Sequence, residues 1–278
     1  MKQKHILTIQ DISCIGRCSL TVALPIISAA GVEASIIPTA VLSTHTGGFE
    51  GYTYRDLTSD IFPIVDHWES LGISFDAMYT GYLGSFEQID IVSDIFDRFN
   101  TGSNFVLVDP AMADNGILYG GFSPDFPKGM AQLCAKADII VPNLTEAAFM
   151  LGEDFVADGY DKAYIEDLLK KLRNLGAPNV VLTGVSLEEG KLGVAAYDGS
   201  SISYYFRDQI EGYYHGTGDV YASSFLAAYV KKKDLVEAAA IATDFTVSCI
   251  ELTAKEDSER RYGVNFEECL PELIDALK

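Results

Sequence analysis

The run Gly216-Thr217-Gly218-Asp219 places two glycines and a carboxylate just ahead of an apolar helical segment. Glycines let a ligand approach the main chain, and the unpaired N–H groups at the start of a helix attract negative charge. A carboxylate at an anion site repels the anion unless it has a chemical role. We expect Asp219 to take a proton from a substrate hydroxyl that attacks a phosphoryl group, while the amides of Gly216, Thr217 and Gly218 hold the charge on the transferring oxygens.

This run alone is weak evidence for phosphoryl transfer. An aspartate near the start of a helix is very common, and short glycine motifs match many sequences by chance. The rest of the chain must therefore show whether other polar groups gather around the same position.

Strands rich in β-branched residues alternate with helical segments along the chain. The pattern predicts parallel strands over His5–Gln10, Ala34–Pro38, Ala77–Thr80, Phe105–Val108, Ile139–Val141 and Val180–Thr183. It predicts helices over Ser19–Ala30, Asp56–Leu71, Phe86–Phe99, Lys128–Ala137, Thr145–Leu151, Tyr164–Leu175, Val220–Lys231, Leu235–Leu252 and Phe266–Leu277. Repeated strand–helix units favour an α/β fold, a single domain over residues 1–278 whose mostly parallel sheet has helices on both faces.

Two further strands, Gly193–Tyr197 and Ser201–Phe206, follow this alternating part. They are joined by Asp198-Gly199-Ser200, and an Asp-Gly pair between alternating strands is typical of a β-hairpin. We therefore expect a small antiparallel addition on one edge of the sheet.

Each predicted parallel strand ends in polar residues or is followed by them. These are Gln10-Asp11, Thr44–Gly48, Thr80–Tyr82, Asp109-Pro110, Asn143–Glu146 and Thr183-Gly184. In open parallel sheets, ligands bind beyond the carboxyl ends of the strands. Six polar ends together with the Gly216–Asp219 run favour a binding site over ordinary surface loops.

Asn143 and Glu146 lie three residues apart at the start of a predicted helix. One interpretation is a reciprocal helix cap, in which each side chain bonds the backbone amide of the other residue. The other places Asn143 and Glu146, together with Asp109, around a hydrated Mg²⁺ that bridges phosphates. Mg²⁺ keeps several waters and needs few protein ligands, so the two interpretations are compatible.

The long glycine-containing segment Ala111–Asp125 follows Asp109 and contains Asp114. Asp114 fits an ordinary solvated loop as well as it fits a functional site. The segment itself is a candidate for a mobile lid that closes over nucleotide phosphates.

Thr44–Gly48 and Tyr82 suggest a pocket for a small, flat, polar substrate, because Tyr82 offers a ring for stacking. His45 and His215 are candidates for contact with an anion or a ring hydroxyl. A lone histidine more often makes a structural hydrogen bond, so this signal is weaker than the others.

Acidic residues outnumber basic ones by 40 to 20, which gives a net charge of −20. Such a charge repels nucleic acid and anionic membranes, so neither is an expected partner, and a nucleotide triphosphate is expected to arrive with Mg²⁺. Charged residues interrupt the most apolar helical segment, Leu235–Leu252, so no membrane span is predicted. Five scattered cysteines without a paired motif favour a reducing cytoplasm over a disulfide framework or a zinc site.

The motifs, taken in order over nearly the whole chain, resemble those of the ribokinase-like superfamily and, within it, those of the pyridoxal kinases. They are Ile9-Gln10-Asp11 with Gly16, Thr44-His45-Thr46-Gly47, Thr80-Gly81-Tyr82, Val108-Asp109-Pro110 with Asp114, Pro142–Ala147, Leu182-Thr183-Gly184 and Gly216–Asp219. The last motif indicates only a small-molecule kinase. His-Thr-Gly and Thr-Gly-Tyr point to pyridoxal kinases over sugar kinases.

The resemblance implies a three-layer sandwich, ATP with Mg²⁺ as phosphoryl donor and usually a homodimer, and it leaves a monovalent-cation requirement open. It implies phosphorylation of the 5′-hydroxymethyl group of pyridoxal, pyridoxine or pyridoxamine. Carried over by position, Asp219 is the base and Gly216–Gly218 the anion hole. Three further sets are implied: Asp109, Asn143 and Glu146 for Mg²⁺ and phosphate, Asp114, Thr183 and Gly184 on the nucleotide side, and Asp11, Thr46 and Tyr82 around the pyridine ring.

Two positions depart from the pattern of the better-known pyridoxal kinases. Asp11 stands where they often carry serine, and a carboxylate facing the ring would favour a protonated nitrogen or a cationic substituent. His215 stands where small apolar or cysteine residues are frequent, and its role is open.

Two alternatives remain at this point. A kinase of hydroxymethylpyrimidine or its phosphate would share the fold and the last motif. A non-catalytic protein that binds pyridoxal phosphate or a nucleotide is the alternative from another class, and the presence of both the glycine turn and Asp219 argues against it.

Overall fold

The computed structural model describes residues 3–231, 233–256 and 260–278. Its strands are β1 (His5–Ser13), β2 (Glu33–Leu42), β3 (Tyr54–Asp56), β4 (Ala77–Thr80), β5 (Phe105–Val108), β6 (Ala113–Asp114), β7 (Ile117–Leu118), β8 (Ile139–Ile140), β9 (Asn179–Val185), β10 (Lys191–Tyr197) and β11 (Ile202–Asp208). Its helices are α1 (Leu20–Ala29), α2 (Thr58–Ser70), α3 (Phe86–Arg98), α4 (Phe126–Cys134), α5 (Leu144–Leu151), α6 (Lys162–Asn174), α7 (Thr217–Val230), α8 (Leu235–Lys255) and α9 (Leu270–Ala276), with 3₁₀ turns η1 (Arg260–Tyr262) and η2 (Glu267–Cys269).

The large sheet has the strand order β11-β10-β9-β8-β5-β4-β1-β2-β3. The strands from β9 to β2 run parallel, whereas β10 and β11 are antiparallel additions at one edge and β3 is antiparallel at the other. In the β10–β11 turn, Asp198 accepts hydrogen bonds from the Ser200 and Ser201 amides, each at 2.8 Å. The predicted mostly parallel sheet and its antiparallel edge are confirmed, and β3 is an addition that the sequence pattern did not indicate.

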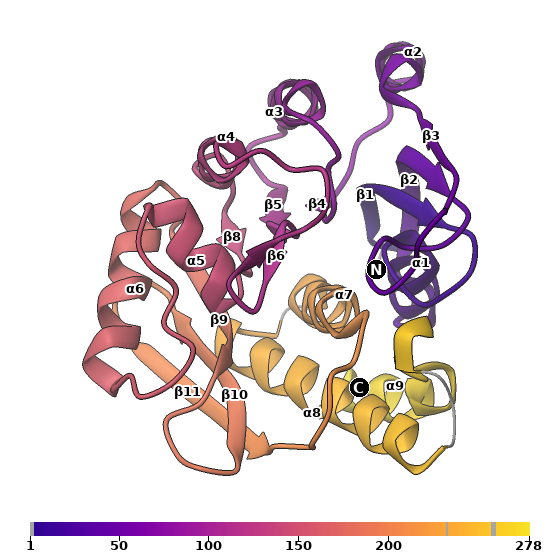
Figure 1. Cartoon of the computed structure of the whole chain (residues 1–278). Helices are drawn as coiled ribbons and strands as arrows, with labels where there is room; N and C mark the ends of the chain where they lie inside the picture. Colours follow the sequence, from indigo (N-terminus) through magenta and orange to yellow (C-terminus); the bar gives the residue numbers. More distant parts are fainter. Residues whose placement is uncertain (1–2, 232, 257–259) are drawn as a thin grey trace.

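Different helices cover the two faces of this sheet (Figure 1). Helices α2 to α6 share one core with inward residues such as Leu7 and Val108. Helices α1, α7, α8 and α9 share the other core with Ile6 and Leu107. Neighbouring strand residues point to opposite faces, so burial of both faces explains why these strands are apolar along nearly their whole length.

Helix α7 lies at the centre of its layer, packed against α1 and α8 (Figure 1). Its residues Val220–Ala228 are all buried. Among them are Ala222, Ser223 and Ala227, whose small side chains let neighbouring helices approach closely. No helix within the described ranges is both long enough and apolar enough to cross a bilayer.

The first strand is longer than predicted, and this changes the position of Asp11. β1 continues to Ser13, so Asp11 lies inside the strand and not beyond its end. Pairing with β4 stops at Ile9, opposite Thr80, and the register with β2 shifts between Gln10 and Ile12. Asp11 therefore lies where β1 extends past its shorter neighbour.

Strand β9 is also longer than predicted. It runs through Thr183 and Gly184 to Val185, whereas the predicted strand ended at Thr183. Thr183 pairs with Val194 of β10 and also forms a bridge to Asn143. The correction follows from β10, because antiparallel pairing extends the strand beyond its apolar part.

The segment Ala111–Asp125 contains the β6–β7 hairpin, which the sequence did not reveal. Ala113–Asp114 pairs with Ile117–Leu118, and the turn residues Asn115 and Gly116 have φ values of 49° and 76°. Left-handed angles at both turn positions are the signature of a tight two-residue hairpin. The hairpin brings Asp114 to the start of α5, because the Gly116 amide donates to Thr145 Oγ1 at 3.0 Å.

Candidate active site

The start of α7 is an open anion-attracting turn. Gly216 is the N-cap with a left-handed φ of 76°, and the first hydrogen bond of the helix runs from the Val220 amide to the Gly216 carbonyl at 3.0 Å. The amides of Thr217, Gly218 and Asp219 precede that bond and are available to an anion. A Cβ on Gly216 would lie 2.1 Å from the Arg17 carbonyl oxygen, while a Cβ on Gly218 would meet nothing within 4 Å.

Asp219 is the third residue of α7 and is partly buried. Burial, opposed in part by the Ser19 N–H and helped by the nearby Asp11 charge, raises the pKa of its carboxyl to about 7. A carboxylate with a pKa near neutrality is well matched to accepting and releasing a proton. The arrangement can therefore deprotonate an alcohol beside a bound anion.

Asp109 directly follows β5, and its amide continues the strand ladder by donating to the Thr80 carbonyl at 2.9 Å. Its side chain is 8% exposed. Burial raises the pKa of Asp109 well above its usual value, and the nearby charges of Glu146 and Asp219 raise it further. Within the described residues no side chain or amide donates a hydrogen bond to this carboxylate, so it is a buried acceptor suited to a cation or a hydrated cation.

Asn143 and Glu146 form the reciprocal cap that the sequence suggested. Asn143 Oδ1 accepts from the Glu146 amide, and Glu146 Oε2 accepts from the Asn143 amide, both at 2.9 Å. Asn143 Nδ2 donates to the Ala113 carbonyl at 2.9 Å, and Glu146 Oε1 accepts from the Met112 amide at 3.1 Å. The cap therefore also fastens the segment that leads into the β6–β7 hairpin.

These contacts limit how a metal can bind here. The Asn143 side-chain amide already makes hydrogen bonds through both its oxygen and its nitrogen, and both carboxylate oxygens of Glu146 accept from backbone amides. In the part of the chain that the structure describes, no three His, Cys, Asp or Glu side chains are placed to enclose an ion. Asp109 is thus the residue that fits Mg²⁺ best, with most of the remaining coordination left to water and phosphate.

Asp114, Thr183 and Gly184 lie around the same end of the sheet. Asp114 Oδ2 accepts from the Tyr213 hydroxyl at 2.9 Å, which links the hairpin to the segment before Gly216. Thr183 is bridged to Asn143, and Gly184 has a left-handed φ of 73° with no atom within 4 Å of an added Cβ. Contact of these three residues with a nucleotide stays a prediction.

Asp11, which lies near Asp219, and Tyr82 form what we call the polar and aromatic wall. Asp11 is 4% exposed and accepts from Ser13 Oγ at 3.1 Å and from Ser19 Oγ. Burial raises the pKa of Asp11 and of the Tyr82 hydroxyl, whose pKa the Asp11 charge raises further. Tyr82 packs 5.5 Å from Phe122 between ring centroids. This wall offers a ring and a carboxylate to a flat polar ligand.

His45 and Thr46 lie in the loop after β2. His45 Nε2 contacts the Arg261 carbonyl at 2.6 Å, and the Gly47 amide donates to Nδ1 at 3.2 Å. Both ring nitrogens of His45 are thus used inside the protein, which is the structural role considered for a lone histidine. The His45 ring lies 5.1 Å from the ring of His215, and burial lowers the pKa of both. Thr46 is partly buried in the same loop. A substrate contact from His45 or Thr46 stays a prediction.

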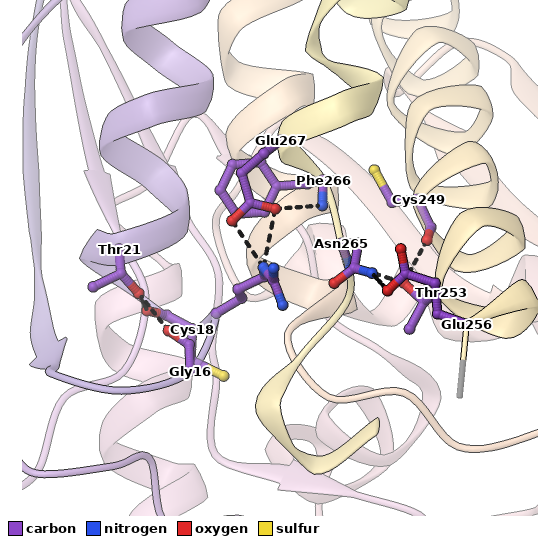
Figure 2. A network of polar contacts seen from close by, with 10 residues as sticks. Gly16, Cys18, Thr21, Cys249, Thr253, Glu256, Asn265, Phe266 and Glu267 are labelled. Atoms are coloured by element: carbon purple, nitrogen blue, oxygen red, sulfur yellow. Dashed lines mark hydrogen bonds and ion pairs between the residues drawn. The ribbon is translucent and has the colours of Figure 1, made fainter. Parts of the chain in front are cut away.

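The loop between β1 and α1 packs against the anion turn, because the Arg17 carbonyl lies next to Gly216. Residues of the C-terminal part of the chain hold this loop in place. Arg17 Nε donates to both carboxylate oxygens of Glu267 at 2.8 and 3.0 Å, and the Arg17 amide donates to the Tyr262 carbonyl at 2.7 Å. Figure 2 shows Glu267 beside this loop, with Thr21 bonded to the backbone of Gly16 and Cys18.

Sequence reasoning missed these supporting residues. An ion pair that spans 250 residues has no local signal. Ser19 could have been noted as a serine just before a helix, but its hydroxyl bonds Asp11 and makes no helix cap.

Two hollows lie at the opposite edge of the sheet, where the parallel strands begin. One, of about 180 Å³, is lined by residues that include Asn104, Lys136 and Asp138. The other, of about 260 Å³, includes Lys4 and Asp76, which pair at 2.6 Å. Ligands of open parallel sheets bind at the carboxyl ends of the strands, so neither hollow is a better candidate for the active site than the region around Asp219.

Residues 24–263 match the phosphomethylpyrimidine kinase family. The chain belongs to this family. Bacillus subtilis pyridoxine kinase is 29% identical over 188 residues, which are 64% of this chain and slightly less than two thirds of that protein, at 65%.

Two solved structures match along nearly the full chain. A Bacteroides thetaiotaomicron protein, described as a candidate phosphomethylpyrimidine kinase and crystallised with pyridoxal, is 36% identical. Its TM-score is 0.93, and the match covers 98% of this chain and 96% of that one. Pyridoxal kinase from Lactobacillus plantarum is 28% identical with a TM-score of 0.90, covering 99% and 98%. The layered α/β fold is thus that of a pyridoxal kinase.

Proposed function

We propose that the chain is an ATP-dependent kinase that phosphorylates the 5′-hydroxymethyl group of pyridoxal, pyridoxine or pyridoxamine. The observation that carries the proposal is Asp219, a carboxyl with a pKa of about 7 beside the free amides of the Gly216 turn. Likeness to the pyridoxal-bound Bacteroides protein and to the Lactobacillus pyridoxal kinase supports the choice of substrate.

In the proposed reaction, Asp219 removes the proton from the 5′-hydroxyl as that oxygen attacks the terminal phosphorus of ATP. The bond from this phosphorus to the bridging oxygen breaks, so the products are the 5′-phosphate ester and ADP. The amides of Thr217, Gly218 and Asp219 hold the negative charge on the transferring oxygens. Mg²⁺ would supply charge neutralisation on the phosphates; Asp109 would hold it, with Asn143 and Glu146 fixing the backbone around it.

The substrate ring would lie against the wall that contains Asp11 and Tyr82. The nucleotide would lie toward Asp114, Thr183 and Gly184, on the side of the β6–β7 hairpin. Asp219 interacts electrostatically with both Asp11 and Asp109, which supports a base that can reach both the ring and the phosphates.

The direct test is a coupled assay of ADP formation with Mg²⁺, ATP and each of the three vitamers, with the ester identified by mass spectrometry. Asp219→Asn should keep its circular dichroism spectrum and lose turnover by about 10²- to 10⁴-fold, the range expected for a general base. Unchanged turnover of this variant would remove Asp219 as the base. Tight vitamer binding with no ADP from the wild type would instead indicate a non-catalytic binding protein.

The second candidate is a kinase of hydroxymethylpyrimidine or its phosphate, which the name of the matched family favours. Competition of pyridoxine and hydroxymethylpyrimidine in one reaction compares their kcat/KM values directly. We expect the pyridine to be preferred, and a preference for the pyrimidine would move the assignment to that activity.

We also propose a homodimer that works in the cytoplasm. The cysteines Cys14, Cys18, Cys134, Cys249 and Cys269 are free thiols in the structure, as in proteins of a reducing compartment. Light scattering coupled to size exclusion should give twice the 30.3 kDa chain mass, and the monomer mass would contradict the dimer.

A further inference from the structure

The three residues Tyr213–His215 form a segment that we call the strap. It leads directly into the anion turn, because His215 is followed by Gly216. The strap is neither helix nor strand, so its backbone lacks the ladder of hydrogen bonds that fixes such elements. The Thr217 hydroxyl at the start of α7 donates to the Tyr214 carbonyl at 3.3 Å. The remaining contacts of the strap decide where the chain enters the turn.

The hydroxyl of Tyr213 fastens the strap to the tip of the β6–β7 hairpin. It donates to Asp114 Oδ2 at 2.9 Å, across 99 residues of sequence. Asp114 is itself held in place, because its Oδ1 accepts from the Asn115 amide at 2.9 Å and its Oδ2 from Asn115 Nδ2 at 3.2 Å. Partial burial and the Asp114 charge raise the pKa of the Tyr213 hydroxyl, so it remains a donor at neutral pH.

The ring of His215 fastens the strap to the loop after β2. The rings of Tyr213 and His215 meet edge to face with their centroids 4.8 Å apart, and the His215 ring lies 5.1 Å from that of His45. A Cβ on Gly47 would lie 2.8 Å from His215 Cε1, which is closer than packing allows. Gly47 has no left-handed φ, so its missing side chain makes room for His215 and does not serve the loop's own backbone.

These contacts connect the two sides of the site through the residues next to the anion turn. One end is the hairpin on the proposed nucleotide side, and the other is the loop that was predicted to contact the substrate ring. Tyr213 is 52% exposed, so its contacts contribute little to global stability. Their main effect is therefore local, on the backbone that leads to Gly216.

We propose that Tyr213 is a positioning residue for phosphoryl transfer: its hydroxyl bond to Asp114 and its packing on His215 fix the entry of the chain into the Gly216 turn. The inference rests on the proposed function, in which the amides of this turn hold the charge on the transferring oxygens. It explains why an exposed tyrosine three residues before the turn has its hydroxyl bonded to a distant element.

The first test is Tyr213→Phe, which removes the hydroxyl and keeps the ring. Its kcat should fall by about 5- to 20-fold, less than the roughly 10²-fold that a full 1 Å misplacement can bring. KM for pyridoxine should change by less than about threefold, because no substrate contact is lost. The thermal midpoint should stay within about 2 °C of wild type, as expected for a surface substitution. Steady-state kinetics and thermal unfolding measure these quantities.

Tyr205→Phe is the matched control. The Tyr205 hydroxyl also bonds an aspartate, donating to Asp244 with both oxygens at 2.9 Å, but it lies on the edge strand β11. Its loss should leave kcat within about twofold of wild type. A double-mutant cycle with Asp114→Ala then shows whether Tyr213 acts through Asp114. The double variant should have a kcat within about twofold of Asp114→Ala alone, because the same bond is already lost.

The second test disturbs the strap from its other end. Gly47→Ala forces the His215 ring to move, and should lower kcat without Tyr213 being changed. In a His215→Ala background the added methyl group has space, so Gly47→Ala should then change kcat by less than about twofold. An equal loss in both backgrounds would mean that Gly47 acts on the substrate directly and not through the strap.

Four outcomes overturn the inference. They are an unchanged kcat in Tyr213→Phe, an equal fall in Tyr205→Phe, additive losses in the cycle with Asp114→Ala, and an effect of Gly47→Ala that does not depend on His215. Wild type and Asp219→Asn separate this failure from failure of the proposed function. If wild type turns over and Asp219→Asn does not, while Tyr213→Phe stays fully active, the kinase assignment stands and only the role of Tyr213 falls. If wild type forms no ADP with any vitamer, both fall together.

Discussion

Helices α5 and α7 begin at the same edge of the sheet, and each carries an acidic residue at its third position. In α5, Asn143 and Glu146 satisfy the helix amides with two reciprocal hydrogen bonds. In α7, the cap is Gly216, which has no side chain, and the space beside Gly218 is empty within 4 Å. A helix start closed by its own side chains serves the fold, whereas one that keeps its amides free can hold a ligand.

The surroundings of the two acidic residues, Glu146 and Asp219, also differ. Glu146 is 3% exposed and receives backbone hydrogen bonds on both carboxylate oxygens. Asp219 is partly accessible, and the nearby Ser19 N–H favours the charged form of its carboxyl. The same residue class at the same helix position therefore stabilises structure in one helix and is free for proton transfer in the other.

The largest expected effect comes from the two glycines of the α7 turn. Gly216→Ala puts a methyl group 2.1 Å from the Arg17 carbonyl oxygen at a left-handed φ, and should lower the free energy of unfolding by about 3 to 5 kcal/mol. Gly218→Ala meets nothing in the protein, so its unfolding free energy should change by less than about 1 kcal/mol. Its methyl group lies where the phosphate approaches, so KM for ATP should rise. Urea denaturation and steady-state kinetics measure both, and equal stability losses would contradict an open turn.

A smaller effect is expected from removing the two acids in turn. Glu146→Ala leaves the buried amides of Asn143 and Met112 without acceptors, and should destabilise the protein by about 2 to 4 kcal/mol. Asp219→Ala removes a carboxylate that burial disfavours, so it should leave the free energy of unfolding unchanged or raise it. Thermal unfolding at neutral pH measures both variants. A loss of stability in Asp219→Ala that matches Glu146→Ala would erase the distinction between the two helices.

The smallest effect concerns how the stability of Asp219→Asn depends on pH. The folded pKa of Asp219, about 7, lies above the ordinary aspartate value of 3.8, so the folded state prefers the protonated form. Its favourable contribution is complete at low pH and is lost as pH rises through the folded pKa. Between about pH 5 and about pH 8, wild type should lose about 3 kcal/mol of stability relative to Asp219→Asn, which does not titrate. A difference between the two proteins that is flat with pH would mean that burial does not disfavour the charged form.

Much of the fold follows from local sequence signals. β4 (Ala77–Thr80) and β5 (Phe105–Val108) have the bounds that the apolar runs predicted. The antiparallel hairpin was signalled by its Asp-Gly turn. β3 and the β6–β7 hairpin escaped prediction because they are only two or three residues long, and their pairing depends on residues distant in the sequence or in a long glycine-containing segment.

The candidate site was predictable where a backbone motif creates it. Gly216–Asp219 and the Asn143–Glu146 cap have short-range spacings with a physical meaning, and both have the predicted local geometry. Ser19 and Arg17 act through contacts with Asp11 and Glu267 that no local pattern encodes. His45 was predicted as a ligand contact, but both of its ring nitrogens are used inside the protein. Nε2 contacts the Arg261 carbonyl, 216 residues away in sequence, and Nδ1 accepts from the Gly47 amide.

The contact between Arg17 and Glu267 has a consequence for biosynthesis. Arg17 leaves the ribosome 250 residues before Glu267, yet the contacts that hold the β1–α1 loop beside the glycine turn need both residues. A nascent chain can form its first strands and helices well before this pairing. The loop beside the glycine turn should therefore reach its final arrangement only after residue 267 has emerged from the exit tunnel.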